Sequence, residues 1–327
     1  TGNALKENVK KISGYFRITE NDIIIIARPI YHCAVLTGEV LTSIYNGCNI
    51  YFFDDKYNPI KIAHCLKERR ISVMCGTPTL LNYISDHLIK RKILHSVRKI
   101  ALSGECLTKE FALNIRKAFP DAEIYNVYGL TEAAPRVTYL PPKDFDRKCE
   151  SVGIPLDGII IKIVDSVTRA ELPANTHGVI AVKSPCVMKG YYNNSEYTSK
   201  VLQDGWLYTG DIGYSDEEGY LYVMSRADDM IIKGGMNIYP KEIENSILKL
   251  DEIRECMAYR VTKTNKQQDI GVDIVLQKNI SLSKKDLLSR LSKVLPQYQI
   301  PAAVNITDKI ARNASGKIVR PKNVVIT

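Results

Sequence analysis

Five short apolar segments alternate with helix-like segments over residues 22–125. The apolar segments are rich in Ile, Val and aromatic residues, as in a parallel sheet buried on both faces. They lie at residues 22–27, 49–53, 71–75, 99–102 and 123–125. Between them, residues 59–70 and the residues after Thr108 carry apolar side chains at helical spacing, with Thr108 as a suitable N-cap. This alternation predicts a mostly parallel α/β sheet, which we assign to residues 1–140.

The pattern changes further along the chain. Residues 151–224 hold short apolar segments separated by Gly or Asp-Gly. This spacing predicts antiparallel strands, so we assign residues 141–225 to a small antiparallel, β-barrel-like subdomain. From residue 226, helical spacing returns after Pro240 and near Ser283. We therefore expect a large domain over 1–225 and a small, mobile α+β domain over 226–327, as suits a chain of 327 residues.

The composition disfavours several classes of protein. Hydrophobic residues make up 45% and charged residues 25%, as in globular proteins. The longest apolar run near the start, residues 23–27, is too short for a membrane span, and no secretion signal is visible. The eight cysteines include no C-x-x-C pair, so we expect reduced thiols in a cytoplasmic protein.

The positive net charge allows two interpretations. A formal net charge of +9 suits a polyanionic ligand or simply a basic surface. The lysine-rich residues 89–99 lack interleaved aromatics and any nucleic-acid motif. We expect a solvated helix face followed by a strand there, and no nucleic-acid partner.

The stretch NVYGLTE, residues 126–132, places polar side chains after a predicted strand. We expect that strand to end near Tyr125 and the chain to turn through Tyr128 and Gly129. Ligands of α/β sheets bind beyond the carboxyl ends of strands. There a Tyr ring can stack on a base, Thr131 can bond a phosphate oxygen and Glu132 can hold Mg²⁺. The alternative is a turn followed by a capped helix.

The stretch from residue 204 to 244 contains a candidate ribose site. We expect Asp211 to be exposed between two short strands, and Arg226 to follow another strand. A carboxylate that accepts hydrogen bonds from two hydroxyls, with a guanidinium nearby, would bind ribose. The alternative is that Asp211 is simply a turn residue and Arg226 a surface residue. Gly234 and Gly235 permit positive φ or a close backbone approach.

The stretch ARNASGKIVR, residues 311–320, presents Lys317 in a polar, turn-rich setting. A solubilising tail is the simplest explanation of such a lysine. The order of all these stretches indicates something more specific, because the chain resembles the adenylate-forming superfamily of AMP-dependent synthetases and ligases. That superfamily includes acyl-CoA synthetases, nonribosomal peptide adenylation domains and firefly-type luciferases. The resemblance also rests on ARPIYHCAVL (27–36), GTPTLL (76–81), LSGECL (102–107), SVGIPLDGIIIKIVD (151–165), GVIAVKSPCVMKGYY (178–192), LYTGDIG (207–213) and SRADDMIIKGGMNIYPKEIE (225–244).

The resemblance implies an ATP-dependent, AMP-forming acid–thiol ligase that makes an acyl-adenylate and then a thioester. ATP or AMP, Mg²⁺ and coenzyme A are the implied cofactors. The implied site residues are Gly104, Glu105, Asn126 and Tyr128 at adenine, Asp211 and Arg226 at ribose, Thr131 at phosphate, Glu132 at Mg²⁺, Asp228 at the hinge between the domains, Gly235 at the pantetheine channel and Lys317 as the catalytic lysine.

The implied role of Lys317 has a physical basis. Attack of a carboxylate on the α-phosphate of ATP brings two anions together, and an ammonium group can contact both. The lysine must then withdraw so that a thiol can enter. A loop on a hinged lid domain suits that task.

The implied acid pocket lies near residues 30–35, 76–80, 103–104 and 129–130. His32 stands where amino-acid-activating relatives carry Asp, and no carboxylate follows until Glu39. This disfavours an α-amino acid and favours an aliphatic or aromatic acid. The candidate substrate residues are His32, Thr79, Ser103, Gly129 and Leu130.

One family motif, a Ser/Thr/Gly-rich phosphate loop, is absent from the sequence. It precedes the motifs found here, and residues 1–12 resemble the helix that follows it. We therefore expect a fragment whose missing N-terminal part is a partner for activity, so that this chain alone turns over little. The open alternatives are an acyl-AMP ligase that loads a carrier protein's phosphopantetheine, as nonribosomal adenylation domains do, and a non-catalytic nucleotide-binding relative.

Overall fold

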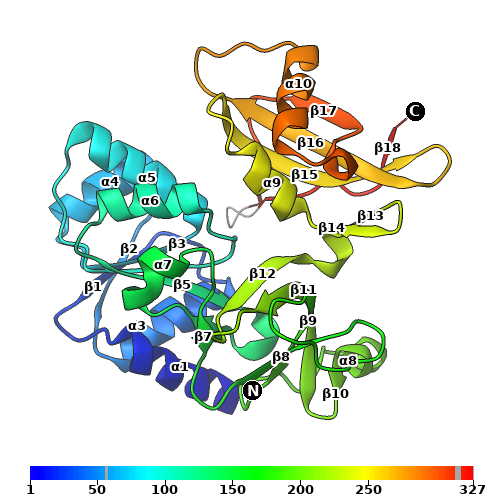
Figure 1. The fold of residues 1–327 in the computed structure, drawn as a ribbon. Helices are drawn as coiled ribbons and strands as arrows, with labels where there is room; N and C mark the ends of the chain where they lie inside the picture. The colour runs from blue at the N-terminus through cyan, green and yellow to red at the C-terminus, as the bar shows by residue number, and fades with distance from the viewer. Residues whose placement is uncertain (56–57, 314–317, 327) are drawn as a thin grey trace. The chain divides into compact units, whose positions relative to one another are not determined.

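The computed structural model describes residues 1–55, 58–313 and 318–326, which form two compact units (Figure 1). The first comprises Thr1–Thr209 and Gly213–Val223. The second comprises Gly210–Ile212, Met224–Asn313 and 318–326. None of the described helices is long and apolar enough to cross a membrane.

The first unit contains a mixed sheet whose described strands follow the order β2-β1-β3-β4-β5-β6-β7. Strands β1 to β5 are parallel, and β6 and β7 add to the sheet in antiparallel fashion. The strands are β1 (Ile23–Ile26), β2 (Asn49–Phe52), β3 (Val73–Gly76), β4 (Lys99–Leu102), β5 (Glu123–Gly129), β6 (Arg136–Tyr139) and β7 (Ile154–Pro155). The predicted alternation is confirmed, with boundaries shifted by at most two residues except at the end of β5.

Helices cover both faces of this sheet. On one face, α4, α5 and α6 bury apolar side chains against β1, β3, β4 and β5. On the other, α1 packs Ile12, Tyr15 and Phe16 against the same strands. Thr108 caps α6 as predicted, because its hydroxyl accepts from the Phe111 amide at 3.2 Å. The helices of this part are α1 (Gly2–Phe16), α2 (Cys33–Val35), the π-helix η1 (Leu36–Leu41), α3 (Thr42–Tyr45), α4 (Pro59–Glu68), α5 (Pro78–Arg91), α6 (Lys109–Ala118), η2 (Thr131–Ala133), η3 (Pro142–Asp144) and α7 (Phe145–Lys148).

An antiparallel sheet follows, as predicted, in the order β10-β11-β9-β8, with β12 paired to β11. Its strands and short helix are β8 (Ile160–Val164), β9 (Gly178–Lys183), α8 (Ser195–Val201), β10 (Leu202–Gln203), β11 (Trp206–Ser215) and β12 (Leu221–Arg226). The two short strands expected around Asp211 are wrong, since β11 is continuous through that residue. Gly210 has φ 71° within β11, next to Asp211, where the sequence suggested that one strand ends and another begins.

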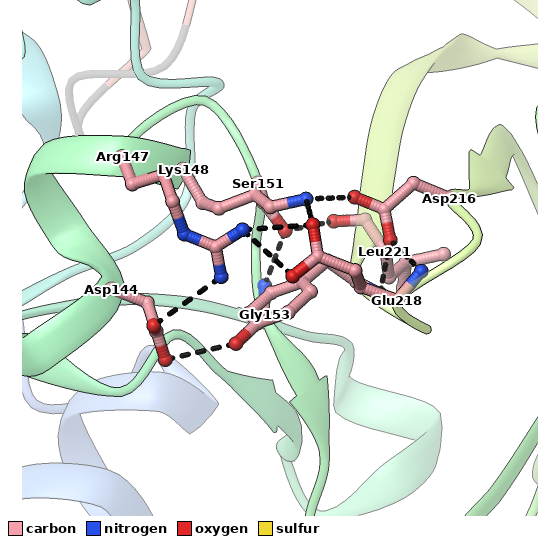
Figure 2. A network of polar contacts seen from close by, with 9 residues as sticks. Asp144, Arg147, Lys148, Ser151, Gly153, Asp216, Glu218 and Leu221 are labelled. Atoms are coloured by element: carbon pink, nitrogen blue, oxygen red, sulfur yellow. Dashed lines mark hydrogen bonds and ion pairs between the residues drawn. The ribbon is translucent and has the colours of Figure 1, made fainter.

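A polar network fastens the turn between β11 and β12 to α7 (Figure 2). Lys148 contacts Asp216 at 2.5 Å and Glu218 at 2.7 Å, and Arg147 contacts Glu218 at 2.7 Å. The Tyr220 hydroxyl donates to Asp144 at 2.8 Å. These contacts join the antiparallel hairpin to the α/β part of the same unit.

The second unit contains an α+β fold, in agreement with the predicted fold class. Its four-stranded sheet has the order β17-β16-β15-β18 among the described strands, beside the hairpin β13–β14. Apolar residues of α9 and α10 pack on the sheet in a separate core. The elements are η4 (Ala227–Asp229), β13 (Ile231–Lys233), β14 (Met236–Ile238), α9 (Pro240–Ile247), β15 (Ile253–Lys263), β16 (Gln268–Leu276), α10 (Lys284–Val294), η5 (Gln297–Gln299), β17 (Ala303–Ile306) and β18 (Val324–Ile326).

Candidate functional site

The segment after β5 carries the predicted phosphate and metal residues. The sequence prediction of a turn at Tyr128 and Gly129 is wrong, because β5 extends to Gly129 and pairs with β6 there. Glycine is required at 129, since a Cβ would lie 2.0 Å from the Pro135 carbonyl oxygen. The chain turns afterwards, through η2, which carries Thr131 and Glu132.

The Glu132 carboxylate is held by a residue that sequence reasoning did not single out. The Tyr191 hydroxyl donates to Glu132 Oε1 at 2.7 Å, and the Met188 amide donates to the Glu132 carbonyl at 2.8 Å. Tyr191 belongs to the quoted stretch GVIAVKSPCVMKGYY, but nothing in that stretch indicates which side chain reaches back to η2.

Two predicted adenine residues lie on β5. Asn126 is 1% exposed, and its amide nitrogen donates to the carbonyls of Cys149 at 3.2 Å and Ser151 at 2.8 Å. Its Oδ1 is buried and accepts no hydrogen bond within the described residues. Tyr128 is also buried. The site thus offers an unused acceptor, of the kind that an exocyclic amino group of a base would satisfy.

The loops after β3 and β4 meet at the carboxyl edge of the sheet. Glu105 Oε2 accepts from the Thr79 amide at 3.2 Å and from the Thr79 hydroxyl at 2.7 Å. Ser103 accepts from Arg28 at 3.1 Å. Gly104 between them has φ 94° and is exposed. Predicted acid and adenine residues therefore lie together where α/β proteins bind ligands.

The loop after β1 contains the predicted substrate residue His32. Its side chain is half-buried and caps α2, with Nδ1 accepting from the Ala34 amide at 3.3 Å. The same segment contains a buried ion pair between Arg28 and Glu39 that sequence reasoning did not identify.

The predicted ribose residues lie in the second unit and contact each other. Arg226 Nη1 donates to Asp211 Oδ1 at 2.9 Å. Contrary to the expectation of an exposed turn, Asp211 is 7% exposed and lies within β11, whereas Arg226 ends β12 and is exposed. Because β11 continues through residue 211 and pairs with β12, Asp211 lies inside a strand instead of a turn, and Arg226 is the last residue of the neighbouring strand.

The remaining predictions fall on the second unit. Gly234 and Gly235 connect β13 to β14 with φ 59° and 81°, as the sequence suggested. Asp228 lies exposed in η4. Lys317 lies outside the described residues. On either side of residues 314–317, Arg312 and Ile318 form an antiparallel bridge.

A magnesium ion would have one protein carboxylate here. The described residues contain no group of three or more metal-ligating side chains. Mg²⁺ commonly takes one or two carboxylates and completes its shell with water and substrate phosphates. Glu132, half-buried beside a hydroxyl donor, fits that arrangement.

Sequence comparisons relate the chain to known proteins. Residues 1–192 match the AMP-binding enzyme family, and residues 242–317 match the AMP-binding enzyme C-terminal domain. A 2-succinylbenzoate–CoA ligase of Oceanobacillus iheyensis is 31% identical over 305 residues, covering 92% of this chain and 61% of that protein. A long-chain-fatty-acid–CoA ligase of Bacillus subtilis is 31% identical over 293 residues, covering 89% of this chain and 52% of that protein.

Solved structures show the same fold. ATP-bound MatB from Rhodopseudomonas palustris matches with a TM-score of 0.88 at 29% identity, over 97% of this chain and 62% of that chain. The o-succinylbenzoate CoA synthetase MenE of Bacillus subtilis, in complex with the acyl-adenylate intermediate OSB-AMP, matches with a TM-score of 0.84 at 29% identity, over 98% and 64%.

The parallel sheet, the antiparallel sheet and the polar residues at the carboxyl edge define an α/β architecture. More particularly, this chain belongs to the AMP-binding enzyme family. The predicted membership of the adenylate-forming superfamily is confirmed. The chain spans 61% and 52% of the length of the two curated relatives named above.

Proposed function

We propose that this chain belongs to an ATP-dependent, AMP-forming acid–thiol ligase that activates a carboxylic acid as acyl-adenylate and transfers it to CoA. The observation that carries this proposal is the family match in both parts of the chain, together with relatives named as CoA ligases at 31% identity. Those names favour CoA over a carrier protein's phosphopantetheine as the acceptor.

The proposed contacts of the nucleotide follow the roles that the sequence predicts for each residue. Asn126 Oδ1 and the Tyr128 ring would meet adenine, and Asp211 with Arg226 would bind the ribose hydroxyls. Thr131 would donate to a phosphate oxygen. When bound, Mg²⁺ would neutralise phosphate charge, with Glu132 as its protein ligand. These contacts would orient the α-phosphate toward the acid.

The C-terminal part would act as a lid. We propose that residues 226–327 move about Asp228, that Lys317 contacts the acyl and phosphate oxygens during adenylation, and that Gly235 leaves room for the pantetheine arm. A lysine that enters and leaves with the lid suits two successive half-reactions. We also propose that activity requires the phosphate loop of the family and that the protein works in the cytoplasm, since its cysteines are free.

Carboxylate-dependent ATP–pyrophosphate exchange tests this proposal. The assay would use the full-length protein that contains this chain, with fatty, aryl and amino acids as substrates and CoA added in a second step. We expect exchange with one class of acid, loss of exchange in Lys317→Ala, and thioester on addition of CoA. ATP binding without exchange for any acid would refute the ligase and leave a non-catalytic nucleotide-binding protein. Exchange followed by transfer to a carrier protein but not to CoA would refute the CoA assignment.

A further inference from the structure

We propose that the acid pocket is built around two buried arginines, Arg28 and Arg136, and selects a carboxylic acid that carries a second anionic group. This inference rests on the proposed function and names the substrate class of the same site. All the residues that carry it belong to the first unit.

Arg28 reaches the predicted pocket from the end of β1. Its side chain is 4% exposed and forms an ion pair with Glu39, which is 0% exposed. Its Nη1 also donates to the Ser103 hydroxyl at 3.1 Å. One arginine and one carboxylate are thereby buried next to a predicted substrate residue, and their charges cancel.

Arg136 adds a second positive charge at the start of β6. It is 3% exposed. Its backbone is fixed by the buried Asn8 side chain, which accepts from the Arg136 amide at 3.0 Å and donates to its carbonyl at 2.8 Å. In the β5–β6 register, Arg136 lies opposite Gly129, another predicted substrate residue. Its position is therefore set by the fold rather than by an ionic partner.

The Arg136 guanidinium lacks a charged partner within the part of the chain that the structure describes. Its Nε is buried without a hydrogen-bond partner there, and none of the described ion pairs includes it. The guanidinium points toward η1, since a Cβ on Gly38 would lie 3.0 Å from Arg136 Nη2. Gly38 precedes Glu39, so both arginines approach the same helical segment.

The thiol of Cys75 in β3 supports this convergence. Burial raises its pKa well above the usual value, the Glu39 charge raises it further, and the charges of Arg28 and Arg136 lower it. A thiol on which all three charges act lies within electrostatic range of each of them. Together with the Arg28–Glu39 ion pair and the approach of Arg136 to Gly38, this places the three charged side chains in one cluster.

The cluster has an excess of one positive charge. Two guanidiniums face one carboxylate, and a buried charge without a counter-ion is strongly unfavourable. Among the described residues, Glu132 is a further carboxylate whose charge acts, with that of Arg136, on the pKa of the Cys33 thiol. Its Oε1 accepts from Tyr191, and we assign this carboxylate to Mg²⁺. A second anionic group on the substrate would supply the missing charge, with Arg136 as a bidentate donor. An alkyl chain would leave the guanidinium unpaired.

Matched pairs of acids test the inference. ATP–pyrophosphate exchange by the full-length protein would be measured with succinate against butyrate, adipate against hexanoate, and terephthalate against benzoate. We expect kcat/KM for the dianionic member of one pair to exceed that of its partner by about 100-fold, since a site built for a polar group rejects the analogue that lacks it.

Variants at Arg136 separate recognition from structure. Arg136→Met should lower kcat/KM for the diacid by about 100-fold while leaving the monoacid unchanged or improved, and Arg136→Lys should recover part of the loss. Arg17→Gln, an exposed arginine of the same unit, should change neither. Thermal unfolding would verify that each variant is folded, and the wild-type preference stands as a test even where a variant is not.

The outcomes are distinct. Exchange with monoacids in preference to every diacid would overturn this inference and leave the ligase proposal intact. An equal loss for both members of a pair in Arg136→Met would show a structural role and would also overturn it. No exchange with any acid would refute the proposed function itself, and the inference with it.

Discussion

Tyr191 donates a 2.7 Å hydrogen bond from its hydroxyl to Oε1 of Glu132, across 59 residues of sequence. Glu132 lies in η2 after the last long strand of the mixed sheet, and Tyr191 lies between β9 and α8 of the antiparallel region. The second bond, from the Met188 amide to the Glu132 carbonyl at 2.8 Å, joins the same two segments. The carboxylate assigned to Mg²⁺ is therefore oriented by a residue from the connection between β9 and α8.

Tyr191→Phe should weaken the use of magnesium. Loss of a hydrogen bond to a carboxylate costs about 1.5 kcal/mol, so kcat/KM for exchange should fall about tenfold, and more Mg²⁺ should be needed for half-maximal rate. Exchange measured against Mg²⁺ concentration would show this. Tyr192→Phe is the matched control, because Tyr192 is 93% exposed. An unchanged Mg²⁺ dependence in Tyr191→Phe would argue against the assignment of Glu132.

Asp211→Asn should weaken recognition of the ribose hydroxyls. The carboxylate accepts from Arg226 at 2.9 Å, and an amide would replace an acceptor by a donor. KM for ATP should rise about tenfold, whereas KM for 2′,3′-dideoxy-ATP should change little. Glu217→Gln, at an exposed turn residue, is the control. An equal rise for both nucleotides would contradict a contact with the hydroxyls.

Leu66→Ala should destabilise the fold through its apolar core. Leu66 of α4 is 0% exposed and packs in the core beneath α4, α5 and α6. Loss of its side chain leaves a cavity, at a cost of about 2–5 kcal/mol in the free energy of unfolding. Chemical denaturation would measure the loss. Leu113→Ala on α6 removes a side chain that is 63% exposed, so it should cost less than about 0.5 kcal/mol.

Asp269 should make the stability of the second unit depend on pH. Burial alone would raise the pKa of Asp269, but hydrogen bonds from Lys233 and Lys263, each at 2.7 Å, lower it overall. A lowered pKa in the folded state stabilises the fold above the unfolded-state pKa of about 3.9, and this contribution disappears as the pH falls through the folded-state pKa.

The corresponding variant is Asp269→Asn. It should lower the free energy of unfolding by about 2–3 kcal/mol at pH 7, and its difference from wild type should shrink as the pH falls below about 4. Denaturation between pH 3 and 7 would measure this difference. Asp251→Asn, at an exposed carboxylate of the same unit, is the control. A difference that stays constant with pH would show that the ion pairs with Lys233 and Lys263 are not its cause.

Local pattern determined most of the secondary structure. The period of the apolar residues predicted β1 to β4, and Thr108 predicted the start of α6, because strand alternation and N-caps depend on neighbours in sequence. The predicted end of β5 was wrong because it depends on pairing with another strand, which the local sequence pattern does not show. The last residues of β5 pair with β6. Glycine is needed at 129 because the Pro135 carbonyl leaves no room for a side chain, and not because the chain turns there.

The candidate site, too, was predictable from the sequence only in part. The order of the motifs led us to predict Asn126, Glu132, Asp211 and Arg226 as site residues, and their roles stay predictions. The sequence by itself thus determined the fold class, the family and the residue types available for nucleotide chemistry.

Only the tertiary structure decided how those residues are held and what surrounds them. Tyr191 reaches Glu132, Asn8 fixes Arg136, and Arg28 pairs with Glu39 beside Ser103. Most of these contacts join elements far apart in the sequence, and no local rule relates them. Burial then gives the charges their importance, because a guanidinium that water would screen at the surface requires a partner inside the protein.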